Sequence, residues 1–208
     1  LDLEHLDSYK NIDDLKNNFI QFANSISFYG TVALCLDSQN LISILNNIKR
    51  KIVTFSLTNK NANIYTKNII NDENRTSFDV IINNKNSYRI KLNVPGEHNI
   101  YNALGSIALA SELNIDKKII QKGLEAYEGV KRRFDIRYYI KNKNILLIDD
   151  YAHHPVEINK TLNSIKAGWP NRRIIAIFQP HLYSRTQNFY LDFAESLRIS
   201  EGDFKSNF

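Results

Sequence analysis

Polar and ionisable side chains follow two apolar, strand-like runs in the second half of the sequence, 145–148 and 173–178. The first run is followed by Asp149, Asp150, Tyr151, His153 and His154, and the second by Gln179, His181 and Arg185. Open α/β sheets bind ligands in the crevice outside the carboxyl ends of their parallel strands. A lone histidine is more often structural than functional, but two successive polar strand ends favour a ligand site.

A second candidate site lies where Pro95-Gly96 leads into a helix predicted over 99–113. His98, Asn99 and Asn102 stand at its start. The start of a helix presents free N–H groups, and an Asn amide can both donate to and accept from the edge of a nucleobase. The alternative is that Asn99 only caps the helix. The segment by itself leaves both interpretations open.

Two shorter motifs also carry charge. Arg132 and Arg133 follow the domain boundary that we expect near Val130. Paired arginines usually face solvent, but at a hinge between domains they are well placed for a bidentate grip on phosphate. At the N-terminus, Glu4-His5-Leu6-Asp7 offers oxygen and imidazole ligands for a divalent ion, although four loop residues are a weak signal alone.

The pattern of apolar residues predicts the elements that position these groups. Helical spacing indicates helices over 13–27, 41–48, 99–113, 116–127, 155–167 and 184–197. Short apolar runs indicate strands over 31–36, 52–57, 145–148 and 173–178, and alternation over 62–94 indicates an antiparallel meander. After residue 131 the strand–helix alternation predicts parallel βαβ units. The fold class is therefore α/β.

Composition excludes several classes of protein. The chain has 208 residues and a net charge of +5, but its basic residues are scattered, which argues against a nucleic-acid partner. No apolar run is long enough to span a membrane. The single cysteine, Cys35, suits a reducing cytoplasm and lies in an apolar run that predicts a buried, inert thiol. The chain begins with Leu1 and lacks methionine, so we expect it to be part of a longer protein.

The motifs occur in one order along the chain: (D/E)HLD, PGxHNxxN, RRFD, DDYxHHP and FQPHxYxRT. This order resembles the Mur ligase family, over 1 to about 199, and most closely its alanine-adding members. The resemblance implies that 1–130 is the latter part of a central ATP-binding domain. It implies that 131–208 is the first half of a Rossmann-like C-terminal domain. No G-x-x-x-x-G-K-[ST] loop occurs, so we expect this chain alone to be inactive and to bind ATP weakly at best.

The resemblance also implies roles for individual residues. It assigns His5 to Mg²⁺, His98 and Asn102 to adenine, Arg133 (or alternatively Arg132) to the ATP phosphates, and Asp150 to the ribose. It assigns His153 and Arg185 to the substrate carboxylate, with Tyr151 and His181 lining that pocket. The expected catalytic residues are Arg133, His153 and Arg185. Leu182 stands where many relatives carry Arg, so one anionic contact is lost or supplied elsewhere.

The activity implied is formation of an amide through an acyl phosphate. ATP, with Mg²⁺, activates the lactyl carboxylate of UDP-N-acetylmuramate, which the amine of L-alanine then attacks in the cytoplasm. Such chemistry requires positioning and charge neutralisation more than covalent help from the protein. Two alternatives are a Mur-type ligase that recycles ready-made murein peptides and a non-catalytic nucleotide-binding remnant. Product formation with tripeptide but not with L-alanine would favour the first alternative.

Overall fold

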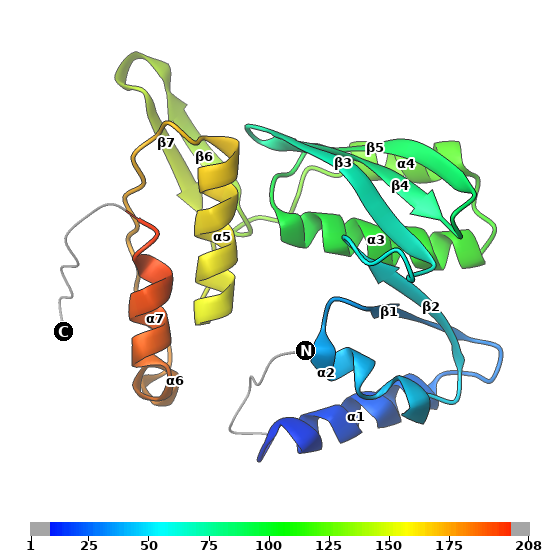
Figure 1. The fold of residues 1–208 in the computed structure, drawn as a ribbon. Coiled ribbons are helices and arrows are strands. Elements are labelled where there is room, and N and C mark those ends of the chain that lie inside the picture. Colours follow the sequence, from blue (N-terminus) through cyan, green and yellow to red (C-terminus); the bar gives the residue numbers. More distant parts are fainter. Residues whose placement is uncertain (1–8, 201–208) are drawn as a thin grey trace. The chain divides into compact units, whose positions relative to one another are not determined.

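Residues 9–200 are described by the computed structural model, which Figure 1 draws as a ribbon. The chain forms two compact units. The first comprises residues up to 69 together with 77–91 and 100–125, and the second comprises 70–76, 92–99 and the residues from 126 onward. The loop that carries His98 therefore belongs to the same unit as the C-terminal strands and helices.

The first unit contains most of a five-stranded sheet with the order β1-β2-β3-β4-β5. The strands are β1 (Thr31–Cys35), β2 (Lys51–Ser56), β3 (Ile64–Asp72), β4 (Arg75–Ile82) and β5 (Asn86–Leu92). β1 pairs with β2 in parallel, and β2 with β3 likewise. Because only a few residues separate β3, β4 and β5, these neighbouring strands form the meander that the sequence predicts.

Four α-helices begin in this part of the chain: α1 (Ile12–Ser25), α2 (Gln39–Ile42), α3 (Glu97–Glu112) and α4 (Lys117–Glu125). Asn11 caps α1 by accepting a hydrogen bond from the Asp14 amide at 2.9 Å. The continuous helix predicted over 41–48 is wrong, because α2 ends at Ile42 and a separate 3₁₀ turn covers Leu45–Asn47. The Ser43 hydroxyl donates to the Asn40 carbonyl, a local bond of the kind that competes with helix continuation.

The core of the first unit lies between the sheet and α3, which runs along β3–β5 in Figure 1. Its fully buried side chains include Phe78, Val80, Ile90, Leu104 and Ile107. The small residues of α3 allow a close approach to the strands. A Cβ atom added at Gly105 would lie 3.7 Å from the ring of Phe55 in β2.

The second unit pairs a small sheet with three helices. β6 (Asp135–Ile140) and β7 (Ile145–Asp149) form an antiparallel pair. The helices are α5 (Pro155–Gly168), α6 (Tyr183–Asn188) and α7 (Tyr190–Leu197). α5 and α7 pack through a cluster of buried apolar side chains: Ile158, Leu162, Phe193 and Leu197. α5 matches its predicted range closely, whereas β6 was not predicted.

The predicted strand over 173–178 is wrong, since this segment forms no ladder with any described strand. Its alternation is real, however. Ile174, Ala176 and Phe178 pack against the α5–α7 cluster, while Ile175 and Ile177 are 65% and 95% exposed. Alternation predicts an extended segment with one buried side, but a strand also requires a partner for its backbone. The expected parallel βαβ pairing is therefore not observed among the described residues, where β7 pairs antiparallel with β6.

Two further predictions are corrected by the structure. The helix expected over 184–197 is divided at Phe189, where the backbone leaves the helical conformation between α6 and α7. Cys35 is half-buried instead of buried, and its burial raises the pKa of the thiol. Within residues 9–200, no helix is both long enough and apolar enough to cross a membrane.

Candidate functional site

The turn that carries Arg133 is held in an unusual backbone conformation. Arg132 and Phe134 both have positive φ angles, 60° and 50°. Residues other than glycine adopt this backbone conformation only when contacts with their surroundings compensate for its cost. The Tyr151 amide donates to the Arg132 carbonyl at 2.7 Å, and the Phe134 amide donates to the Asp150 carboxylate at 2.9 Å. Phe134 is buried and stacks on Trp169. The turn is therefore clamped to the end of β7.

Asp150 is the hub of this clamp. Its Oδ2 accepts from the Phe134 amide and from the Thr161 hydroxyl at 3.2 Å, and its Oδ1 accepts from the Ala152 amide at 2.7 Å. Each carboxylate oxygen can accept two hydrogen bonds. Oδ1 therefore keeps capacity for one further donor such as a sugar hydroxyl. The ribose contact expected of Asp150 stays a prediction, but its organising role in the fold is visible.

Arg132 and Arg133 occupy different surroundings. The Arg132 guanidinium lies 4.8 Å from the centre of the Tyr151 ring, a cation–π distance. The Arg133 Nη1 instead lies 3.3 Å from Glu157 Oε1, and its side chain is 53% exposed. Both arginines are exposed. The choice of Arg133 over Arg132 for the ATP phosphates stays a prediction.

Glu157 connects Arg133 to the start of α5. His154 is the N-cap of α5, Pro155 opens its first turn, and Glu157 completes a capping box by accepting from the His154 amide. The same Oε2 accepts from the His153 amide at 2.9 Å. Burial alone would raise the pKa of Glu157, but the hydrogen bond and charge of His153, together with Arg133, hold that pKa below its ordinary value.

The His153 ring is fixed from two sides. Its Nδ1 lies 2.8 Å from the Tyr151 carbonyl and 3.4 Å from Glu157 Oε2. The Tyr151 and His153 rings are 5.0 Å apart between their centres. The structure therefore brings together four residues that the sequence singles out after the first apolar run and at the boundary: Arg133, Asp150, Tyr151 and His153.

Sequence reasoning missed Glu157. The signal was present, because a polar residue followed three positions later by Glu, before an apolar helical pattern, marks a capping box. The usual N-cap residues are Ser, Thr, Asp and Asn, whereas here His154 takes that position. With His at the N-cap, the capping box is not recognised from the sequence.

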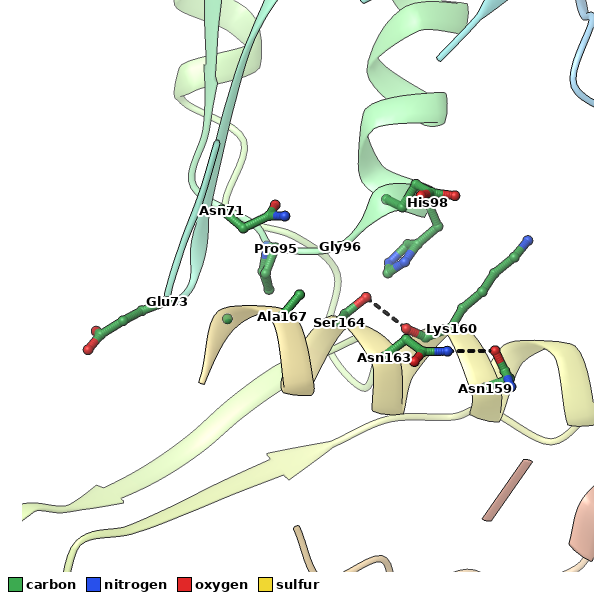
Figure 2. A pocket seen from close by; sticks show the side chains of 12 residues that line it. Asn71, Glu73, Pro95, Gly96, His98, Asn159, Lys160, Asn163, Ser164 and Ala167 are labelled. Carbon is green, nitrogen blue, oxygen red and sulfur yellow. Dashed lines mark hydrogen bonds between the residues drawn. The ribbon is translucent and has the colours of Figure 1, made fainter. Parts of the chain in front are cut away.

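A cavity of about 430 Å³ lies in the second unit, beside α5 and the loop that leads into α3. Figure 2 shows the residues that line it: Asn71, Glu73, Pro95, Gly96, Glu97, His98, Asn159, Lys160, Asn163, Ser164, Ala167 and Gly168. Gly96 has a φ of +96°, and a Cβ atom there would lie 2.7 Å from the Ser164 hydroxyl. Only glycine allows the loop to approach α5 this closely.

His98 reaches into this cavity from the first turn of α3 (Figure 2). Burial lowers the pKa of His98, Asp150 opposes that change, and Lys160 and Arg133 lower the pKa further. A neutral imidazole presents one donor and one acceptor, which is the pattern needed at a nucleobase edge. His98 therefore lies within electrostatic reach of Asp150 and Arg133, the other residues expected to contact the nucleotide.

The two asparagines near His98 behave differently. Asn99 lies inside the first turn of α3, and its side-chain amide donates to the Pro95 carbonyl at 2.6 Å. It secures the loop, so the alternative that Asn99 caps an N–H of the helix is wrong. Asn102 lies one turn further along α3, is exposed, and is not among the residues that line the cavity.

The residues after 173–178 are arranged more loosely. His181 is exposed, and Leu182 has a φ of 68° immediately before α6. Arg185 is half-buried, and within the described part of the chain its Nη1 is buried without a hydrogen-bond acceptor. A buried guanidinium N–H without an acceptor is unfavourable and suits a carboxylate that arrives with a ligand. Over residues 9–200, no hydrogen bond or ion pair joins His181 or Arg185 to Glu157 or His153.

The metal site predicted at His5 lies outside the described residues. Among residues 9–200, no three His, Cys, Asp or Glu side chains are grouped so as to hold a metal ion. The Mg²⁺ assignment stays a prediction. The residues expected to contact ATP do fit such a ligand, because His98, whose pKa burial lowers, lines the cavity, and Asp150 binds the amide of Phe134, the residue that follows Arg133.

Two family models match the chain. The Mur ligase middle domain matches residues 1–110, and the Mur ligase glutamate ligase domain matches residues 132–203. The chain belongs to the Mur ligase family, which confirms the resemblance and the α/β fold class. The domain boundary near Val130 stays a prediction.

Within the family, the chain is similar to ligases that share one name. The chain is 42% identical over 201 residues to the UDP-N-acetylmuramate–L-alanine ligase of Desulforapulum autotrophicum, covering 97% of this chain and 43% of that protein. It is 45% identical over 197 residues to the ligase of the same name from Clostridium tetani, covering 94% of this chain and 42% of that protein. The chain thus spans less than half the length of these relatives.

Solved structures agree with this assignment. The UDP-N-acetylmuramate–alanine ligase MurC from Thermotoga maritima superposes with a TM-score of 0.76 at 29% identity, covering 95% of this chain and 42% of that one. The Thermotoga maritima MurF ligase, solved in complex with ADP, superposes with a TM-score of 0.75 at 15% identity, covering 96% and 45%. At that identity the second likeness shows the fold alone.

Proposed function

We propose that this chain is part of an ATP-dependent ligase that joins L-alanine to the lactyl carboxylate of UDP-N-acetylmuramate in peptidoglycan biosynthesis. The observation that carries the proposal is the group at the end of β7, where Arg133, Asp150 and His153 are held together beside the start of α5. The names of relatives at 42% and 45% identity support the alanine-adding activity over other reactions of the family.

Bound ATP, with Mg²⁺, supplies the phosphoryl group that activates the substrate carboxylate. His98 presents donor and acceptor atoms to the base, and Asp150 Oδ1 accepts from the ribose. Arg133 turns from Glu157 toward the phosphates, which its exposure allows. His153 and Arg185 bind the lactyl carboxylate, with Tyr151 and His181 beside it. Asn102 contacts adenine and His5 binds Mg²⁺ in this scheme.

In this reaction the residues of this chain contribute mainly by positioning the substrates and neutralising charge. Phosphoryl transfer proceeds with charge spread over several oxygens, so cations held in place lower the barrier more than any covalent contribution does. The clamp around Asp150 provides such positioning, because it fixes a strained turn next to His153 and the start of α5. We place this activity in the cytoplasm, where ATP and nucleotide-linked sugars are available.

The test is made on the complete ligase that contains this chain. We expect ADP release to require both UDP-N-acetylmuramate and L-alanine, and Arg185→Ala to raise the KM for the sugar substrate about tenfold, because a bond to a charged group is lost. The 208-residue chain alone should show no turnover. Amide formation with a murein tripeptide but not with L-alanine would instead assign the recycling activity. The absence of any turnover by the complete protein would leave the non-catalytic alternative.

A further inference from the structure

The Glu157 carboxylate does more than cap the start of α5. Its Oε2 accepts from the amides of His153 and His154 and lies 3.4 Å from His153 Nδ1, while its Oε1 pairs with Arg133 at 3.3 Å. A capping box requires only the bond to the N-cap amide. The contacts to Arg133 and to the His153 ring go beyond that requirement. Arg133 is expected to bind the ATP phosphates, and His153 is expected to bind the substrate carboxylate.

The surroundings of the His153 ring determine which nitrogen carries hydrogen. Nδ1 faces the Tyr151 carbonyl and the Glu157 carboxylate, and both can only accept. Nδ1 must therefore be the donor, which leaves Nε2 as the atom available to a ligand. The Tyr151 carbonyl and the Glu157 carboxylate thus hold the ring through Nδ1, and Nε2, on the other side of the ring, points away from both acceptors.

The link to Arg133 is of a different kind. The Arg133 side chain is 53% exposed and that of Glu157 is 27% exposed, so the pair lies at the surface of the site and water can enter it. Such a pair adds little to stability but limits the directions in which a long side chain points. Arg133 can therefore exchange Glu157 for a phosphate without a large rearrangement. The backbone of Arg133 is already fixed by the clamped turn.

We propose that Glu157 is a positioning residue that orients Arg133 and His153 through one carboxylate, so that the phosphate-binding and carboxylate-binding side chains of the ligase are set relative to each other before substrates arrive. This inference rests on the proposed function for the identity of the two ligands. The geometry of the Arg133–Glu157–His153 group does not depend on it.

The first experiment uses NMR on the complete ligase that contains this chain. Imidazole ¹⁵N shifts should show Nδ1 protonated in His153. Glu157→Gln keeps an acceptor for the His153 and His154 amides but loses the charge that attracts Arg133. The ¹⁵Nε–¹H heteronuclear NOE of Arg133 should therefore fall in Glu157→Gln, while the His153 amide stays protected from exchange. Unchanged Arg133 dynamics, or His153 protonated at Nε2 alone, would overturn the proposal.

The second experiment uses steady-state kinetics of the complete ligase. For Glu157→Gln we expect the KM values for ATP and for UDP-N-acetylmuramate to rise together, each about tenfold, because charge-assisted contacts lose their preset partner. A residue that only caps α5 would lower the folded fraction, and hence the apparent kcat, with both KM values unchanged. That outcome would contradict the proposal.

Glu195→Gln is the matched control. Glu195, in α7, also pairs with an arginine, Arg198 at 2.9 Å, but both side chains are more than 70% exposed. This variant should leave both KM values unchanged. If the wild-type ligase forms no product with L-alanine, the proposed function fails. The NMR measurements then still decide whether Glu157 orients Arg133 and His153.

Discussion

The segments 132–161 and 173–185 each carry residues of the predicted substrate site, but they are held in different ways. In the first, Asp150 and Glu157 bind backbone amides, a hydroxyl and a guanidinium from several elements. In the second, the extended run has no ladder partner among the described residues, and Arg185 Nη1 has no acceptor there. Similar motifs after similar apolar runs therefore differ in how far the chain itself preorganises their side chains.

The largest expected effect is at Asp150. Asp150→Ala removes three hydrogen bonds that hold a turn with two positive φ angles, and we expect it to lower the free energy of unfolding by about 3 kcal/mol, at roughly 1 kcal/mol for each bond. Urea denaturation measures this loss. His181→Ala, in the loosely held segment, should change stability by less than about 0.5 kcal/mol. Equal losses in the two variants would remove the distinction between the segments.

Neighbouring positions in 173–178 differ in burial, so substitutions there test whether only one side of this segment is packed. Phe178 packs on the α5–α7 cluster with its ring 5.2 Å from that of Phe193, whereas Ile177 is 95% exposed. We expect Phe178→Ala to cost about 2 kcal/mol, less than for a fully buried Phe, and Ile177→Ala to cost almost nothing. Thermal and urea unfolding of both variants test this. A substantial loss from Ile177→Ala would show that both sides of the segment are packed.

A glycine contact tests the packing of α5 within the second unit. A Cβ atom at Gly168 would lie 2.6 Å from the Glu73 carbonyl oxygen, so Gly168→Ala should destabilise the protein by about 1–2 kcal/mol through a clash with backbone. Gly123 in α4 is the matched control, since no atom beyond its chain neighbours and the adjacent helix backbone lies within 4 Å of its added Cβ. Gly123→Ala should stabilise the helix by about 0.5–1 kcal/mol. Stabilisation by both substitutions would show that α5 does not approach Glu73 so closely.

The smallest expected effect is a pH dependence from His98. Its pKa is lowered from 6.5 in the folded state by burial, so the unfolded chain binds the proton more readily. The His98 contribution is fully present above pH 6.5 and is lost as the pH falls below that value toward the folded pKa. His98→Gln should flatten the pH dependence of the urea midpoint just below pH 6.5. A pH dependence left unchanged by His98→Gln would contradict this expectation.

Local patterns predicted most elements correctly. α1, α3 and α5 follow from helical spacing and caps, and the meander follows from alternation, because these signals depend on residues close together in the chain. The errors have a common cause. The run 145–148 pairs with β6, which carries no clear alternation, and the run 173–178 pairs with no described strand. Strand pairing depends on distant residues, so neither outcome can be read from either run.

The candidate site divides in the same way. The motifs around His98, Arg133, Asp150 and His153 identify residues and, through their order, the family. They do not reveal that most hydrogen bonds of Asp150 hold the fold together or that Glu157 contacts both Arg133 and His153. Those facts depend on a left-handed turn and a helix start meeting at one strand end.

The sequence by itself determined the family of this protein, the helices and strands with strong local periodicity, and the residue types available for binding nucleotide and carboxylate. Only the tertiary structure decided which of those residues are preset and which are loosely held. The physical reason is that a motif records the kind of group present at a position. The direction of an Arg133 or His153 side chain is set by a carboxylate that reaches it from another element of the fold.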